Sequence, residues 1–162
     1  KIWVARNLGS KEQNSILLDN ALATMGAGLP SGMVAKILYG EKKVLIIAGD
    51  GGIMMNLGEL ETAVRLKLNL TILILDDSGF GMIRWKQKDM HLSPFALSFN
   101  NPDFIGLAES FGAVGHKVEK TEDLLPILQK SLKEKGIHVI VCPISYNKAN
   151  KVLASIKDKI IK

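Results

Sequence analysis

The hydrophobic positions of this chain form short apolar runs that alternate with stretches of helical spacing. The runs predict strands at residues 43–48, 69–75, 113–118 and 137–144, with a further short strand at 15–19. The run at 43–48 shows no polar alternation, as is typical of a parallel strand that is covered on both faces.

Between these runs, apolar residues recur every three or four positions, which is typical of amphipathic helices. Asn101 is expected to cap one of them, with Pro102 at its first position. The expected helical segments are 1–8, 31–39, 57–68, 80–88, 102–111, 121–135 and 147–162. This alternation predicts an α/β fold, a doubly wound, mostly parallel sheet with helices on both faces, which binds ligands beyond the carboxyl ends of its strands.

Composition and charge narrow the function classes. The chain has 162 residues, of which 47% are hydrophobic, as expected of one globular domain over residues 1–162. No run is long enough for a membrane span, and the lysines behind the net charge of +5 are dispersed, which disfavours nucleic acid. A single cysteine, Cys142, favours a reducing, cytoplasmic location. Because the chain begins at Lys1 without a methionine, we expect it to be a fragment of a longer protein.

Two aspartates follow two neighbouring strands. Asp50 and Asp77 are one strand-helix-strand unit apart, which predicts that both side chains reach the same edge of the sheet. With carbonyls from the Gly79 turn and diphosphate oxygens, they could complete the shell of a Mg²⁺ ion. The spacing equally allows Asp50 to cap the next helix and Asp77 to shape a turn. Neither a P-loop nor a G-x-G-x-x-G motif offers another phosphate site.

Specific motifs then point to a family. Gly49-Asp50-Gly51, followed by an apolar strand that ends in Asp76-Asp77, resembles the thiamine-diphosphate motif of pyruvate-decarboxylase-like enzymes. Within that superfamily, three stretches resemble acetolactate synthase catalytic subunits: TMGAGLP at 24–30, GELETAVRL at 58–66 and GMIRWKQ at 81–87. The resemblance covers nearly the whole chain and implies the C-terminal, thiamine-diphosphate-binding fold of those longer enzymes.

The resemblance also implies roles for individual residues. Asp50, Asp77 and the carbonyl of Gly79 would bind Mg²⁺, although the family usually has asparagine at the position of Asp77. Met25 would wedge the cofactor into its bent shape, and the carbonyl of Ala23 would accept from its aminopyrimidine. Met82 would overhang the thiazolium and the substrate. The full set implied for cofactor binding is Ala23, Met25, Gly49, Asp50, Gly51, Gly52, Asp77, Gly79, Phe80, Gly81 and Met82.

The implied activity is that of a transferase that condenses two molecules of pyruvate to 2-acetolactate with loss of CO₂, in a homodimer or tetramer. The glutamate that relays protons would belong to the N-terminal domain of a partner subunit. This fragment would then hold no catalytic residue and would be inactive alone. Another thiamine-diphosphate-dependent 2-keto-acid decarboxylase or carboligase is an alternative, and so is a non-catalytic subunit-association domain. The binding of FAD, and a role in branched-chain amino acid biosynthesis or in fermentation, stay open.

Overall fold

Four parallel strands form the centre of the protein. The computed structural model describes residues 1–19 and 22–146, and within them the strands lie in the order β1-β2-β4-β3. All three neighbouring pairs are parallel. The bounds are β1 Leu45–Gly49, β2 Leu70–Asp76, β3 Val114–Lys117 and β4 Ile137–Pro143. The predicted α/β fold with a mostly parallel sheet is confirmed.

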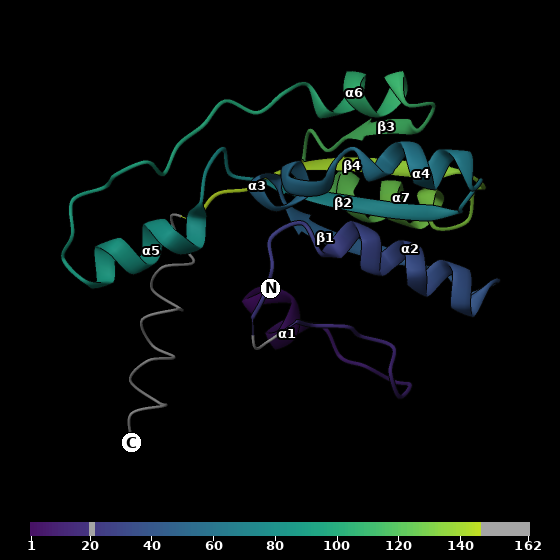
Figure 1. Ribbon diagram of the computed structural model, residues 1–162, viewed down its shortest axis with the longest axis horizontal. Helices are drawn as coiled ribbons and strands as arrows, with labels where there is room; N and C mark the ends of the chain where they lie inside the picture. The colour runs from purple at the N-terminus through teal and green to yellow at the C-terminus, as the bar shows by residue number, and fades with distance from the viewer. Residues whose placement is uncertain (20–21, 147–162) are drawn as a thin grey trace.

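Helices connect these strands, and most of them cover the sheet (Figure 1). The helices are α1 (Ile2–Asn7), α2 (Gly28–Tyr39), α3 (Asp50–Ile53), α4 (Glu59–Arg65), α5 (Gly81–Asp89), α6 (Phe104–Ser110) and α7 (Thr121–Ser131), with a 3-10 turn, η1 (Met54–Asn56). Of these, α1 and α5 lie away from the sheet. In the described part of the chain, no helix is both long and apolar enough to cross a membrane. The helix expected at 147–162 lies outside the described residues.

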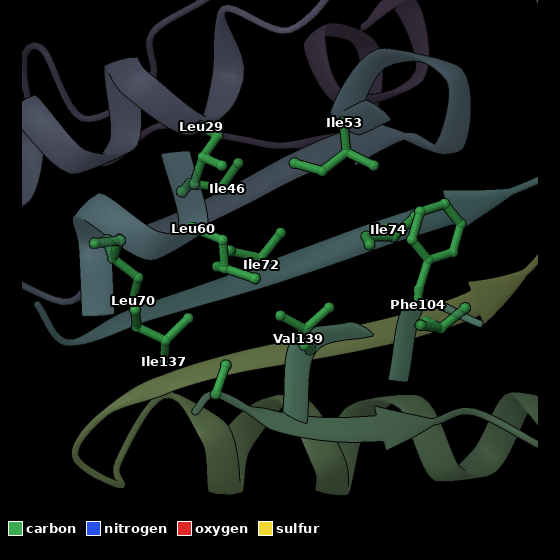
Figure 2. Close-up of a cluster of buried hydrophobic side chains, with 14 of the residues drawn as sticks. Leu29, Ile46, Ile53, Leu60, Leu70, Ile72, Ile74, Phe104, Ile137 and Val139 are labelled. Atoms are coloured by element: carbon green, nitrogen blue, oxygen red, sulfur yellow. The ribbon is translucent and has the colours of Figure 1, made fainter. Parts of the chain in front are cut away.

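The sheet separates two apolar clusters. Alternate residues of β2 point to opposite faces, with Ile72 and Ile74 in one cluster and Leu73 in the other. The larger cluster is closed by α2, α4 and α6, and Figure 2 shows side chains such as Leu29 and Phe104 directed at the strands. The smaller cluster includes apolar residues of α7. Burial on both faces explains why the strand sequences lack polar alternation.

Two local expectations were wrong. Residues 15–19 form no strand, because their backbone is not paired with a neighbouring strand. Asn101 does not cap the helix that follows it. That helix, α6, begins at Phe104, and its N-cap is Asp103, whose Oδ1 accepts a hydrogen bond from the Ile105 amide at 3.1 Å. The side chain of Asn101 is therefore free to act elsewhere.

The long connection after β2 leaves the sheet and returns to it. Figure 1 shows α5 set apart from the sheet, with an extended stretch that leads back to α6. The two ends of the connection are tied together, because Gly79 and Ser98 form an isolated antiparallel bridge and the Phe80 amide donates to the Leu97 carbonyl at 2.9 Å. The helix predicted at 80–88 is confirmed as α5.

Replacing Gly32 by alanine is expected to destabilise the fold. Gly32 faces β1, and a methyl group on it would overlap the side chain of Ile46. Overpacking of this kind costs about 1–3 kcal/mol in the free energy of unfolding. Gly28, in the same helix, is the matched control, because a Cβ there would sit 3.7 Å from Ile46. Urea denaturation should show the loss for Gly32→Ala and not for Gly28→Ala, and equal midpoints would contradict this packing.

Candidate functional site

Strands β1 and β2 end at the same edge of the sheet. Their register pairs Ala48 with Ile74 and Gly49 with Leu75, so the residues after each strand emerge side by side. Asp50 follows β1 as the first residue of α3, and only 1% of its surface is exposed. A carboxylate buried this deeply requires donors or a cation next to it.

Asp50 has two hydrogen-bond donors in the described residues. Its Oδ1 accepts from the backbone amide of Gly51 at 2.9 Å, and its Oδ2 accepts from Nδ2 of Asn101 at 2.8 Å. The N-cap of α3 is Gly49, so the alternative in which Asp50 caps that helix is wrong. Each carboxylate oxygen keeps a lone pair that is available to a cation.

Asp76 shapes the turn that follows β2. Its Oδ1 accepts from the backbone amide of Ser78 at 3.0 Å and from the Ser78 hydroxyl at 3.2 Å, which is the geometry of an Asx turn. The same oxygen accepts from Nδ2 of Asn101 at 2.8 Å. The turn role that the sequence allowed for Asp77 therefore belongs to Asp76, and Asp77 is left for another role.

Asp77 is a buried carboxylate that lacks a full set of partners. Its side chain is 10% exposed, and an ion pair with Nη1 of Arg84 spans 3.7 Å. Its Oδ2 is buried and has no hydrogen-bond partner among the described residues. This oxygen is the one that forms the ion pair with Arg84. A buried acceptor without a hydrogen-bond donor is rare in folded proteins, and a bound ion is one way to satisfy it.

The site is strongly negative. The pKa of Asp77 is raised, first by loss of solvation and second by the charge of Asp50, while Arg84 opposes the shift. Hydrogen bonding between the two carboxyl groups, which requires that one of them is protonated, raises the pKa of Asp77 further. The pKa of Tyr146 is raised as well, by burial and then by the charges of Asp77 and Asp50. A cation would relieve this repulsion.

The turn between β2 and α5 approaches the carboxylates closely. A Cβ on Gly81 would lie 2.6 Å from Oδ2 of Asp77, so a side chain there would displace this carboxylate. The carbonyl of Gly79, an expected metal ligand, accepts from the Gly81 amide at 3.1 Å. Phe80 and Phe99 stack edge to face with centroids 4.9 Å apart, and both rings abut Gly51. A side chain at position 51 or 81 would therefore displace these neighbouring side chains.

Met82 lies at the surface beside this turn. It is 45% exposed on the first turn of α5 and lines a small hollow. The residues around that hollow are Lys1, Ile2, Trp3, Gly81, Met82, Trp85 and Tyr146. Gly81 lines this hollow and also lies directly against the carboxylate of Asp77. An apolar group bound there would therefore lie next to the carboxylates.

Met25 and Ala23 lie on a different loop. Both are exposed, Met25 by 41%. The loop is held against η1, because Asn56 donates from Nδ2 to the Gly26 carbonyl at 3.3 Å. Gly26 has a φ of +92°, and a Cβ on it would lie 2.8 Å from Cβ of Met55. The backbone of this glycine-rich stretch therefore packs closely against η1.

Sequence reasoning missed the residue that joins the two ends of the site. Asn101 stands before a proline and close to a helix, and both signals favour a cap. Its contacts with Asp50 and Asp76 span 51 and 25 positions, which no local pattern reveals. Arg84, which pairs with Asp77, was also missed.

The described residues hold no group of three or more His, Cys, Asp or Glu side chains arranged to bind a metal ion, so a metal here would need backbone or ligand oxygens as well.

Known proteins that are similar to this chain point to one family. The family described as thiamine pyrophosphate enzyme, C-terminal TPP binding domain, matches residues 1–142. An acetolactate synthase of Bacillus subtilis is 35% identical over 146 residues, which are 90% of this chain and 26% of the relative. The catabolic acetolactate synthase of Raoultella terrigena is 35% identical over 145 residues, again 90% of this chain and 26% of the relative. The chain thus spans about a quarter of the length of these relatives.

A solved structure supports the same assignment. The thiamine diphosphate-dependent 4-hydroxybenzoylformate decarboxylase of Rhodococcus jostii RHA1 matches with a TM-score of 0.70 and 25% sequence identity. The match covers 75% of this chain and 23% of that one. The chain therefore belongs to the thiamine pyrophosphate enzymes, in the family of their C-terminal TPP-binding domains.

Proposed function

We propose that this chain binds thiamine diphosphate through Mg²⁺ as the cofactor domain of an acetolactate synthase, which condenses two pyruvates to 2-acetolactate with loss of CO₂. The observation that supports it best is the buried Oδ2 of Asp77, which has no hydrogen-bond partner in the described residues beyond a 3.7 Å ion pair with Arg84 and lies beside Asp50. Mg²⁺ prefers carboxylate oxygens and would offset the charge of both groups. The relatives named acetolactate synthase support the choice of reaction.

The residues at the sheet edge fit a metal-bound diphosphate. Asp50, Asp77 and the Gly79 carbonyl would hold the metal. Of the amides of Gly51 and Gly52, the Gly51 amide already donates to Oδ1 of Asp50, so the Gly52 amide would meet the diphosphate. The space beside Gly52 is open, since a Cβ there would meet no atom within 4 Å. Backbone amides that are not screened by a side chain can approach phosphate oxygens closely.

Bound thiamine diphosphate would supply the carbon nucleophile and the sink for the electrons released with CO₂. The residues of this chain would position the cofactor and shield its reacting end. Met25 would support the bent shape of the cofactor, the Ala23 carbonyl would accept from its amino group, and the turn of Phe80, Gly81 and Met82 would cover the reacting end. Since we place the proton-relaying glutamate on the N-terminal domain of a partner subunit, the 162-residue chain alone is expected to bind cofactor without turnover.

Binding of thiamine diphosphate is expected to depend on a divalent cation. Isothermal titration calorimetry should detect binding in Mg²⁺ and a loss of affinity of about 100-fold or more in EDTA, since the metal joins two like-charged groups. Thiamine without the diphosphate is the control ligand and should bind weakly in both buffers. Equal affinity in Mg²⁺ and EDTA would contradict a metal-bridged site. Absence of binding in both would favour a subunit-association domain.

A second reaction deserves a direct test because the matched solved structure is a 2-keto-acid decarboxylase. Incubating the complete enzyme with pyruvate distinguishes the two. An acetolactate synthase releases 2-acetolactate, which acid converts to acetoin, whereas a simple decarboxylase releases acetaldehyde. Predominant acetaldehyde would overturn the assignment of the reaction and leave the cofactor site intact.

A further inference from the structure

A single amide group links two of the carboxylates at the site. Nδ2 of Asn101 donates to Oδ2 of Asp50 and to Oδ1 of Asp76, each at 2.8 Å. An amide nitrogen has two hydrogens, so each carboxylate can receive one of them. The opposite orientation of the amide would set an oxygen against two carboxylates, and charge therefore fixes which end faces them.

The backbone around Asn101 is held rigidly. Leu97, Ser98 and Phe99 are tied to the Gly79–Phe80 turn by a hydrogen bond, a bridge and a ring contact. Pro102 follows and restricts the backbone of the residue before it. The returning end of the long connection thus delivers Asn101 to the sheet edge in one position.

The amide of Asn101 is an uncharged hydrogen-bond donor in a cluster of carboxylates. Asp50, Asp76 and Asp77 gather there, and Arg84 already pairs with Asp77. A second cationic side chain, placed against Asp50, would compete with a metal for its oxygens. An asparagine amide satisfies one oxygen of Asp50 and leaves the ion-binding charge intact. Residues that hydrogen-bond to metal ligands orient them, and their loss typically lowers metal affinity by about 10–100-fold.

We propose that Asn101 is a positioning residue, which holds the Asp50 carboxylate in its metal-binding orientation by bridging it to Asp76. This inference rests on the proposed function of the site. Asn101 acts through Asp50, and its own Oδ1, which is buried without a hydrogen-bond partner among the described residues, is not required as a ligand. The bridge also joins the returning end of the segment that includes α5 to the metal site.

The test compares Mg²⁺ affinity in three variants of the purified protein. Asn101→Leu keeps much of the side-chain volume without any donor, Asn101→Ala removes both, and Asn100→Ala changes the exposed neighbouring residue as the control. At saturating thiamine diphosphate, the Mg²⁺ dissociation constant should rise about 10–100-fold in both Asn101 variants and less than about threefold in the control. If leucine alone retained wild-type affinity, packing and not donation would be responsible, and the proposal would be overturned.

Two further readouts separate positioning from a general loss of structure. At saturating Mg²⁺, the dissociation constant of thiamine diphosphate should stay within about threefold of wild type, a split that a poorly folded variant would not show. Electron paramagnetic resonance of bound Mn²⁺, at saturation, should show an altered line shape in Asn101→Leu. An unchanged line shape with unchanged affinity would overturn the proposal while the proposed function stands. Failure of the wild-type protein to bind Mg²⁺ would overturn both.

A measurement on the wild-type chain covers the case in which no variant folds. The side-chain amide protons of Asn101 should exchange slowly with solvent in a ¹H–¹⁵N spectrum, because both are in hydrogen bonds. Their signals should shift when Mg²⁺ is added. Rapid exchange, like that of an exposed asparagine, would refute the bridge itself.

Discussion

Asp50→Asn is expected to weaken Mg²⁺-dependent binding of thiamine diphosphate by about 100-fold or more, while the metal-free chain stays folded. Ligand charge largely sets the affinity of an oxygen site for a hard cation, and the amide removes one full negative charge. In EDTA the free energy of unfolding should change by about 1 kcal/mol or less. An amide has a single acceptor oxygen, so one of the hydrogen bonds from the Gly51 and Asn101 donors is lost, and relief of the repulsion on Asp77 offsets that loss.

Calorimetry in Mg²⁺ and urea denaturation in EDTA measure the two effects separately. Glu59→Gln, at an exposed position in the first turn of α4, is the matched control for the loss of one negative charge. It should bind cofactor as the wild type does. Equal cofactor affinity of Asp50→Asn and wild type would refute Asp50 as a metal ligand. A large loss of stability in EDTA would instead assign Asp50 a mainly structural role.

The strands and the pairing of their ends follow from local sequence. A run such as residues 69–75 is apolar at every position except Asn69 and Thr71, and β2 is covered on both faces, so burial alone predicts it. A strand-helix-strand unit then fixes where the next carboxylate falls. The three-residue apolar run within 15–19 is a counterexample. It has the composition of a strand, but strand formation also requires a partner edge, which sequence does not display.

The separate roles of the acidic residues could not be predicted from local sequence. Asp76 and Asp77 are adjacent and chemically equal in the sequence. Their roles separate only because the Asx turn uses Asp76, while Asp77 faces Asp50, Arg84 and the first turn of α5. The residue that spans Asp50 and Asp76 comes from the far end of the long connection. Tertiary contact, and not local propensity, decides these roles.

Asp77→Asn is expected to change how the stability of the metal-free chain depends on pH. The folded-state pKa of Asp77 is raised above the ordinary value of 3.8, so between these two values the folded chain binds more protons than the unfolded chain. The free energy of unfolding therefore falls as the pH rises through this window, and the contribution of protonated Asp77 is fully present only below it. An asparagine does not titrate, so the variant should lack this part of the slope.

Saturating Mg²⁺ and thiamine diphosphate should reverse this pH dependence of the free energy of unfolding in the wild type. The metal favours the charged form of Asp77, so ligand-bound stability should rise with pH over the range in which the free chain loses stability. Urea midpoints between about pH 4 and 7, with EDTA or with both ligands, measure the difference between Asp77→Asn and wild type. Glu109→Gln, exposed on α6, is the control and should follow the wild-type curves. If the urea midpoints of Asp77→Asn and wild type changed in parallel with pH in EDTA, the pKa of Asp77 would not be raised in the folded chain. If they changed in parallel with both ligands present, Asp77 would not be a metal ligand.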